Sequence, residues 1–263
     1  MPFQASPRDQ RQNAPTLACM YLLLLIQHYG YWTGLQLYVR LKILGRGALQ
    51  LPDLQMPVTF RPHTSDRHAF AQVFIQREYE VDYGAPLKYI VDAGANIGMA
   101  TLYFKQRFPE AEVVAIEPHP RNAEAFRLHT SHLKDVRLYE AALHSRGSIE
   151  MHVTDEGFGS NGFMTRLDAS EQSVATVRSI TLEEIRQDMH WPHFDLVKLD
   201  IEGGEGALFE QGLDWMKHTT HIMLEFHERM VRGSSLPVIQ AMAEHGFVLS
   251  QIRGENVLFT KLS

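Results

Sequence analysis

The stretch that decides the fold is residues 91–98, which read VDAGANIG. It follows the apolar residues Tyr89 and Ile90 and precedes a helical pattern at 99–107, so strand, glycine loop and helix come in succession. Open α/β sheets bind their ligands at such junctions, beyond the carboxyl ends of the strands. Residues 91–98 are therefore expected to form a ligand-binding loop.

Further apolar stretches on the C-terminal side of this loop repeat the same alternation. Expected strands lie at 89–91, 112–116, 136–139, 196–199, 222–226, 247–252 and 257–261. Expected helices separate most of them, at 99–107, 121–132, 182–188, 207–211 and 236–245. Alternating strands and helices predict a parallel sheet covered on both faces. Residues 253–256 join the last two strands like a hairpin, so the prediction is an α/β, Rossmann-like, mostly parallel seven-stranded sheet with an antiparallel last strand.

The segment at 144–180 is less regular than the rest of this part of the chain. Its glycine-rich part, 157–163, reads GFGSNGF. Glycine weakens both helices and strands, so this part is expected to be a loop. A loop beside a ligand and a plain surface loop are equally consistent with it.

Composition excludes several classes of function. The chain has 263 residues, of which 44% are hydrophobic and 21% charged, as in ordinary globular proteins. A net charge of −6 argues against a broad basic surface, so no nucleic-acid partner is expected. The single cysteine, Cys19, permits neither an intramolecular disulfide nor a cysteine-based zinc site. It fits a reducing compartment, and we expect a cytoplasmic protein.

The N-terminal part is expected to be distinct from the rest, with a helical extension at 1–50 and a catalytic domain at 51–263. Residues 17–26 form a run of ten apolar residues, whereas a helix that spans a bilayer needs about 20. We favour a helix that packs on the domain. Peripheral contact with a membrane surface is the alternative.

The loop residues distinguish between three kinds of cofactor. A phosphate-binding loop needs the pattern GxxxxGK[ST], which is absent here. A dinucleotide loop needs glycines at 92, 94 and 97, but Asp92 and Ile97 stand there, and a carboxylate would repel a pyrophosphate. S-adenosylmethionine (SAM) has a positive charge and no phosphate, and Gly94 lets the backbone come close to it. The N-terminus of the next helix suits its carboxylate, so we assign Asp92, Ala93, Gly94, Asn96 and Gly98 to SAM binding.

Glu117 supplies a second indication, because it ends the next expected strand. An ionised carboxylate at that place can accept hydrogen bonds from both ribose hydroxyls of SAM. The alternative is a capping or surface acid. After the third strand, the small side chain of Ala142 leaves room for an adenine ring.

The segment at 196–205 reads LVKLDIEGGE, in which the fourth expected strand, 196–199, leads directly into three carboxylates and two glycines. Asp200, at the strand end, is expected to contact the cofactor ammonium or an acceptor hydroxyl. Glu202 and Glu205 are expected to open the next helix, where the helix dipole favours negative charge even without a function.

These residues resemble the FkbM family of SAM-dependent methyltransferases over roughly residues 50–260. The resemblance is carried by Arg61 with Thr64-Ser65-Asp66, the loop at 91–98, Ile116-Glu117-Pro118, the segment at 198–205 and Glu225-x-His227. It implies a Rossmann-like class I methyltransferase fold and places Pro118 beside Glu117 at the cofactor. It also implies O-methylation of a hydroxyl, often on a sugar or a natural product, and some similar proteins are associated with polysaccharide biosynthesis. Gly204 departs from the family pattern, in which alanine is more usual.

Methylation of a hydroxyl needs a base, and His227 and Asp200 are the candidates, with Glu225 behind them. His227 follows the fifth strand, and its neutral form is expected to be plentiful near pH 7. A purely structural His227 is the alternative. Asp200, Glu202 and Glu205 could offer oxygen ligands to magnesium, but we assign no metal ligand at this stage. Two other functions are alternatives: a non-catalytic scaffold in a polysaccharide assembly and, less favoured, a nicotinamide-dependent oxidoreductase.

Overall fold

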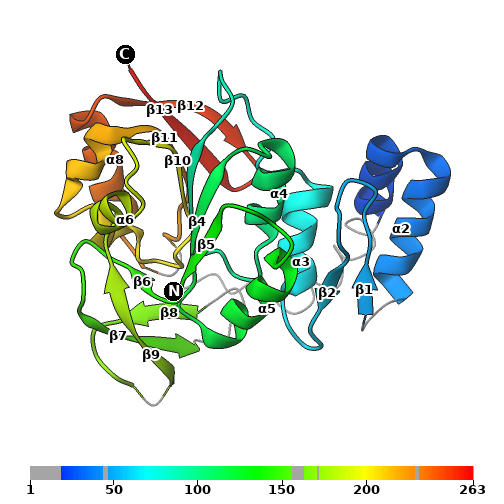
Figure 1. The fold of residues 1–263 in the computed structure, drawn as a ribbon, viewed down its shortest axis with the longest axis horizontal. Helices are drawn as coiled ribbons and strands as arrows, with labels where there is room; N and C mark the ends of the chain where they lie inside the picture. The colour runs from blue at the N-terminus through cyan, green and yellow to red at the C-terminus, as the bar shows by residue number, and fades with distance from the viewer. Residues whose placement is uncertain (1–18, 44–46, 156–162, 171, 229–230, 263) are drawn as a thin grey trace.

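A seven-stranded sheet forms the centre of the protein (Figure 1), as seen in a computed structural model that describes residues 19–43, 47–155, 163–170, 172–228 and 231–262. In chain order its strands are β3 (Tyr89–Ala93), β4 (Glu112–Ile116), β5 (Val136–Tyr139), β10 (Phe194–Leu199), β11 (Thr219–Glu225), β12 (Phe247–Arg253) and β13 (Asn256–Lys261). Their order across the sheet is β12-β13-β11-β10-β3-β4-β5. All seven coincide with expected strands, apart from small shifts at the ends.

The strand directions confirm the predicted Rossmann-like topology. β3, β4, β5, β10 and β11 pair in parallel, whereas β13 runs antiparallel to both β11 and β12. The chain leaves β3 toward β4 on one side, and β10 later pairs with β3 on the other side. This reversal of strand order between β3 and β10 is where open α/β sheets bind ligands.

Helices cover both faces of the sheet, as expected for strands that are apolar on both sides. In Figure 1, α4 (Met99–Arg107) and α5 (Pro120–Thr130) lie on one side, and α6 (Leu182–Asp188) and α8 (Ser235–Glu244) on the other. Successive strand residues point into two hydrophobic cores on opposite faces of the sheet. Val113 belongs to the first core, which includes residues of α4, and Val114 to the second core, which includes residues of α6 and α8. The short helix α7 (Glu205–Leu208) and the 3-10 helix η2 (Leu213–His218) precede β11.

The N-terminal part packs against the first of these cores. It contains a helix at 19–29, α2 (Tyr31–Ile43), the antiparallel pair β1 (Gly47–Leu49) and β2 (Val58–Phe60), α3 (Asp66–Phe70) and the π-helix η1 (Ala71–Ile75). Leu25 and Leu37 share a hydrophobic cluster with Ile90 of the central sheet. Among the described residues, no helix is both long and apolar enough to cross a bilayer. The division of the chain at residue 50 and contact with a membrane surface stay predictions.

The structure contains a second, smaller sheet that the sequence did not reveal. It consists of β6 (Ala142–Leu143), β7 (Glu150–Asp155), β8 (Phe163–Arg166) and β9 (Ser173–Ile180), in the order β6-β9-β7-β8. This sheet is mixed, with β6 parallel to β9 and the other pairs antiparallel. The segment at 144–180 that reads as less regular thus contains three strands, β7, β8 and β9, and β6 precedes it. The exposure of β9 alternates along most of its length, but its sequence, SVATVRSI, does not alternate between apolar and polar residues. The expected loop at 157–163 lies outside the described residues, except for Phe163.

Candidate active site

The carboxyl ends of β3, β4, β10 and β11 surround a cavity of about 310 Å³. Seven of the residues assigned from the sequence line this cavity: Gly94, Asn96, Glu117, Pro118, Ala142, Asp200 and His227. They come from segments up to 133 positions apart (227 minus 94), and the parallel sheet brings them together because its strand ends share one edge. Asp92, Ala93 and Gly98, which were also assigned to the cofactor, are not among the lining residues.

The neighbouring backbone requires a glycine at position 94. Its φ is +75°, a left-handed conformation that L side chains avoid. A Cβ atom at this position would lie 1.7 Å from the carbonyl oxygen of Asp200. The sequence led us to expect close approach to the cofactor, whereas the structure adds a close approach between the ends of β3 and β10.

Asp92 lies behind the cavity wall, in a pair with Lys198. The two residues are cross-strand neighbours on β3 and β10, and the side chains are fully buried and almost fully buried, respectively. Lys198 Nζ lies 3.0 Å from Asp92 Oδ1, and the Thr101 hydroxyl donates to Asp92 Oδ2 at 2.7 Å. Lys198 also donates to the carbonyl oxygens of Ala93 and Gly94, at 3.2 and 2.9 Å. The Asp92 carboxylate thus fixes the position of Lys198, which in turn binds the backbone at the start of the glycine loop. Direct contact between Asp92 and SAM stays a prediction.

Burial has the largest single effect on the pKa of Lys198, but the neighbouring groups together outweigh it. Desolvation alone would lower the pKa of the buried ammonium, but the charges of Asp92 and Asp200 outweigh desolvation and raise it. Lys198 is therefore a permanent cation behind the loop.

Glu117 is buried and already accepts three hydrogen bonds. Its Oε2 accepts the backbone N–H of Asn96 at 2.8 Å. Its Oε1 accepts the backbone N–H of His119 at 2.9 Å and the Asn122 amide at 3.3 Å. Burial raises the pKa of Glu117 to about 7, although these donors and Lys198 act in the opposite direction. The carboxylate is thereby fixed in orientation at the cavity wall.

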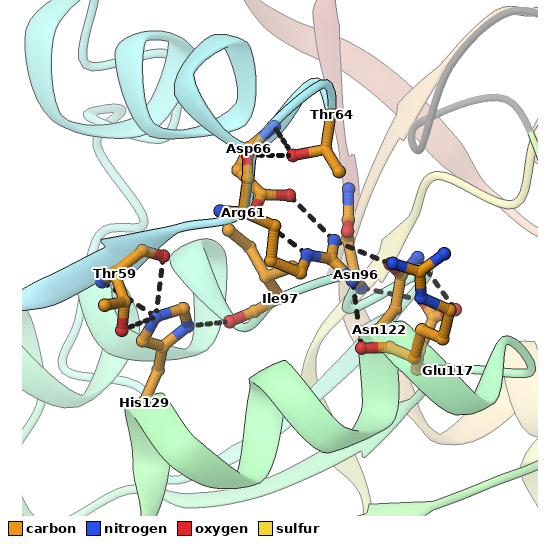
Figure 2. A network of polar contacts seen from close by, with 10 residues as sticks. Thr59, Arg61, Thr64, Asp66, Asn96, Ile97, Glu117, Asn122 and His129 are labelled. Atoms are coloured by element: carbon orange, nitrogen blue, oxygen red, sulfur yellow. Dashed lines mark hydrogen bonds and ion pairs between the residues drawn. The ribbon is translucent and has the colours of Figure 1, made fainter. Parts of the chain in front are cut away.

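A chain of polar contacts ties Glu117 to the segment before the main sheet (Figure 2). Arg61 Nη2 donates to Asp66 Oδ1 at 2.7 Å and to Asn122 Oδ1 at 2.9 Å, and Asn122 in turn donates to Glu117. Asp66 is 1% exposed, so Arg61 and Asp66 form a largely buried, two-pronged ion pair. Arg61 and Asp66 were noticed in the sequence only through the family resemblance. The structure makes them a support for the residue assigned to the ribose.

His227 lies at the opposite end of the cavity, among four carboxylates. Its Nδ1 forms a hydrogen bond of 2.9 Å with Glu205 Oε1. Its Nε2 lies 3.6 Å from Asp200 Oδ1, 3.5 Å from Glu202 Oε2 and 3.7 Å from Glu225 Oε1. The cavity therefore has an acidic end, formed by these three carboxylates around Nε2.

The protonation of His227 differs from the expectation. Burial alone would lower its pKa, but the hydrogen bond to Glu205 and the charges of Glu205, Asp200 and Glu202 raise it to about 9. The expectation of a plentiful neutral form near pH 7 is therefore wrong for the protein without ligands, because the sequence does not reveal how many acids surround the ring. Desolvation, with Asp200 next, raises the pKa values of Glu202 and Glu225 well above the usual range.

Glu205 orients His227 and does not line the cavity. Its side chain is 2% exposed and also accepts the backbone N–H groups of Ile201 and Gly203, at 3.1 and 3.0 Å. Only Glu205 begins α7; Glu202 precedes the helix with a φ of +52° and points into the cavity. The expectation that both glutamates open the helix is wrong, because the chain makes a glycine turn between them.

Several lining residues were not predicted. Phe163 and Thr165 of β8 line the cavity next to Glu117, and the Phe163 ring stacks on His119 with centroids 3.9 Å apart. Tyr79 and Glu255 contribute from outside the main motifs. Phe163 and Thr165 follow from the unpredicted second sheet, and Glu255 from the hairpin between β12 and β13.

The fold and this site define a Rossmann-like class I methyltransferase, and a sequence comparison adds the family. The family model of the methyltransferase FkbM domain matches residues 92–249. The protein belongs to the FkbM methyltransferase family, which confirms the resemblance seen in the sequence.

Named relatives carry methyltransferase descriptions. Methyltransferase sdnD of Sordaria araneosa is 25% identical over 224 residues, which cover 71% of this chain and 83% of that protein. The 2-O-methyltransferase NoeI of Sinorhizobium fredii is 26% identical over 168 residues, which cover 58% of this chain and 69% of that protein.

Solved structures with a similar arrangement are more distant. A precorrin-6y C5,15-methyltransferase from Geobacter metallireducens has a TM-score of 0.46 at 12% identity, covering 81% of this chain and all of that one. Aeropyrum pernix fibrillarin, solved with bound S-adenosyl-L-methionine, has a TM-score of 0.43 at 8% identity, covering 73% of this chain and 75% of that one.

Proposed function

We propose that this methyltransferase uses SAM to methylate a hydroxyl group, with a sugar as the acceptor in polysaccharide or natural-product biosynthesis. The observation that carries the proposal is a single cavity with a fixed carboxylate, Glu117, at one end and the acidic group around His227 at the other. A cytoplasmic location belongs to the same proposal.

The residues present fit SAM. Among the described residues, Oε2 of Glu117 accepts one hydrogen bond, from the backbone N–H of Asn96, so a lone pair on that oxygen is available for a ribose hydroxyl. Ala142 is small and lines the cavity beside Glu117, which suits an adenine ring. At the other end, Asp200 offers a carboxylate to the ammonium group. When bound, SAM supplies the methyl group on its positively charged sulfur.

Orientation of the acceptor accounts for much of the proposed rate. In-line transfer requires the acceptor oxygen to be held against the methyl group, and such positioning accounts for a large share of catalysis in two-substrate reactions. Glu202, Glu225 and Glu255 line the acidic end and can accept hydrogen bonds from several hydroxyls of one molecule. This favours a polyhydroxylated acceptor, as does the 2-O-methyltransferase among the relatives.

His227 and Asp200 form the pair assigned to the acceptor proton. Their side chains lie 3.6 Å apart and both line the cavity. Asp200 is 30% exposed and is the more accessible of the two, so a hydroxyl can reach its oxygen directly. His227, held by Glu205, keeps a positive charge beside Asp200 and fixes the position of that carboxylate.

Methyl transfer by variants tests the proposal against a non-catalytic scaffold. With labelled SAM and cell-envelope fractions as the source of acceptor, the wild type should transfer label to carbohydrate. Asp200→Asn and His227→Ala should each lower the rate by roughly 10²–10⁴-fold, the usual contribution of a group that moves a proton. His218→Ala, on an exposed residue before the same strand β11, is the matched control and should keep the wild-type rate. A wild type that transfers no label to any fraction would favour the scaffold.

A further inference from the structure

The acidic end of the cavity has the geometry of an ion site. One oxygen each from Asp200 and Glu202 and one nitrogen of His227 all lie within 4.8 Å of one another. Ligands at 2.1 Å from an octahedral ion lie about 3.0 Å apart when adjacent and about 4.2 Å when opposite. The distances of 3.6 and 3.5 Å from Nε2 to Asp200 and Glu202 fall between these values.

His227 is the observation that separates this group from an ordinary acidic cluster. Its side chain is 9% exposed, and Nδ1 is occupied by the hydrogen bond to Glu205. Among the described residues no hydrogen bond to Nε2 is found, and this nitrogen is directed at the carboxylates from 3.5 Å or more. A ring held by a buried carboxylate through one nitrogen, with the other nitrogen aimed at a group of oxygens, is the usual arrangement of a metal-binding histidine.

The neighbouring cation cannot replace an ion here. Lys198 Nζ lies 3.7 Å from Asp200 Oδ2, farther than from Asp92 and from the two carbonyl oxygens that it also contacts. Glu225 adds another carboxylate, 3.7 Å from Nε2. Asp200, Glu202 and Glu225 thus place three carboxyl groups around one imidazole, and a divalent cation bound between them would favour the ionised forms of these acids.

We propose that Asp200, Glu202 and Nε2 of His227 bind a divalent cation of the Mg²⁺ or Mn²⁺ kind, which displaces the proton from Nε2 into solvent. Carboxylate oxygens suit both ions, and the imidazole nitrogen favours Mn²⁺. Glu205 is the positioning residue, in contrast to its consideration as an oxygen ligand in the sequence. Three protein ligands leave positions open toward the cavity. If the proposed function holds, hydroxyl oxygens of the acceptor would occupy those positions, and the cation would lower the pKa of a bound hydroxyl.

Manganese binding tests this proposal without any methyl acceptor. Titration of the full chain with MnCl₂, followed by the electron paramagnetic resonance signal of free Mn²⁺, should show one saturable site. Glu202→Gln and His227→Ala should weaken binding more than tenfold, and Glu205→Gln by about 10–100-fold, the usual effect of removing the partner of a ligating histidine. Glu244→Gln, on an exposed glutamate of α8, should bind as the wild type does.

Two results would overturn the proposal: no saturable site in the wild type up to millimolar Mn²⁺, or a site that Glu202→Gln and His227→Ala leave unchanged. Wild-type crystals soaked in MnCl₂ give an answer even if a variant fails to fold, because an anomalous peak must lie between Asp200, Glu202 and His227. SAM titrations on the same samples separate the two proposals. SAM binding without Mn²⁺ binding removes the ion and leaves the methyltransferase function, and the reverse removes SAM as the donor.

Discussion

Replacing Gly94 with alanine is expected to lower the free energy of unfolding by about 3 kcal/mol or more. A side chain at φ +75° costs about 1–2 kcal/mol through the left-handed backbone alone. The added Cβ would also lie 1.7 Å from the Asp200 carbonyl oxygen, so the ends of β3 and β10 would have to move apart. That movement adds the cost of overpacking a tightly packed core, about 1–3 kcal/mol.

Gly84→Ala is a closely matched control for this substitution. Gly84 has nearly the same φ, +74°, but its Cβ would have nothing within 4 Å. Gly84→Ala should therefore lower the free energy of unfolding only by the cost of the left-handed backbone, about 1–2 kcal/mol. Urea unfolding of both variants measures the difference. Equal losses for Gly84→Ala and Gly94→Ala would show that the contact between β3 and β10 does not constrain position 94.

The second large effect is a loss of stability as the pH rises from about 6 to 9 in the protein without ligands. Burial raises the pKa values of Glu78 and Glu117 to about 7, and surrounding carboxylates raise that of His227 to about 9. In the unfolded chain glutamates release their protons near pH 4.5 and histidine near 6.5. Above those values the folded protein binds more protons than the unfolded chain, so its stability falls as the pH rises.

The number of extra protons on the folded protein determines how steeply the free energy of unfolding falls with pH. Each extra proton held by the folded protein lowers the free energy of unfolding by about 1.4 kcal/mol per pH unit. Urea unfolding at low salt, at pH 6 and pH 8.5, measures it. Glu202→Gln should flatten the dependence because it removes one acid from the group around His227, whereas Glu244→Gln should not. Stability that stays constant or rises over this range would contradict the description of the acidic end of the cavity.

The main sheet could be predicted from the sequence because its strands are strongly patterned. Strands such as Glu112–Ile116 are apolar on both sides and lie between clear helical patterns, so their number, order and directions followed. The second sheet could not be predicted in the same way. Its strands flank a glycine-rich stretch, and pairing between β7 and β9 joins residues 19 to 28 positions apart (Thr154 with Ser173, Glu150 with Arg178), which local pattern does not reveal.

The sequence predicts which residues line the site, but it does not predict which partners their side chains contact. Glu117, Asp200 and His227 were recognised because each follows a predicted strand, and strand ends meet at one edge. Whether a carboxylate at such an end faces the cavity or a buried lysine depends on the neighbouring strand. Asp92 illustrates this, because its partner Lys198 comes from β10, 106 positions away (198 minus 92). The raised pKa of His227 has the same origin, since its four acidic neighbours come from two separate segments, 200–205 and the end of β11.

Binding of SAM to the purified protein tests the central claim most directly. Isothermal titration should give one molecule of SAM bound per chain, and Glu117→Gln should weaken binding about tenfold or more, because hydrogen bonds to a charged group contribute about 1.5–3 kcal/mol. Glu112→Gln, at the opposite end of the same strand β4, should bind as the wild type does. A wild-type protein that shows no binding at millimolar SAM would contradict the assignment of this cavity to the methyl donor.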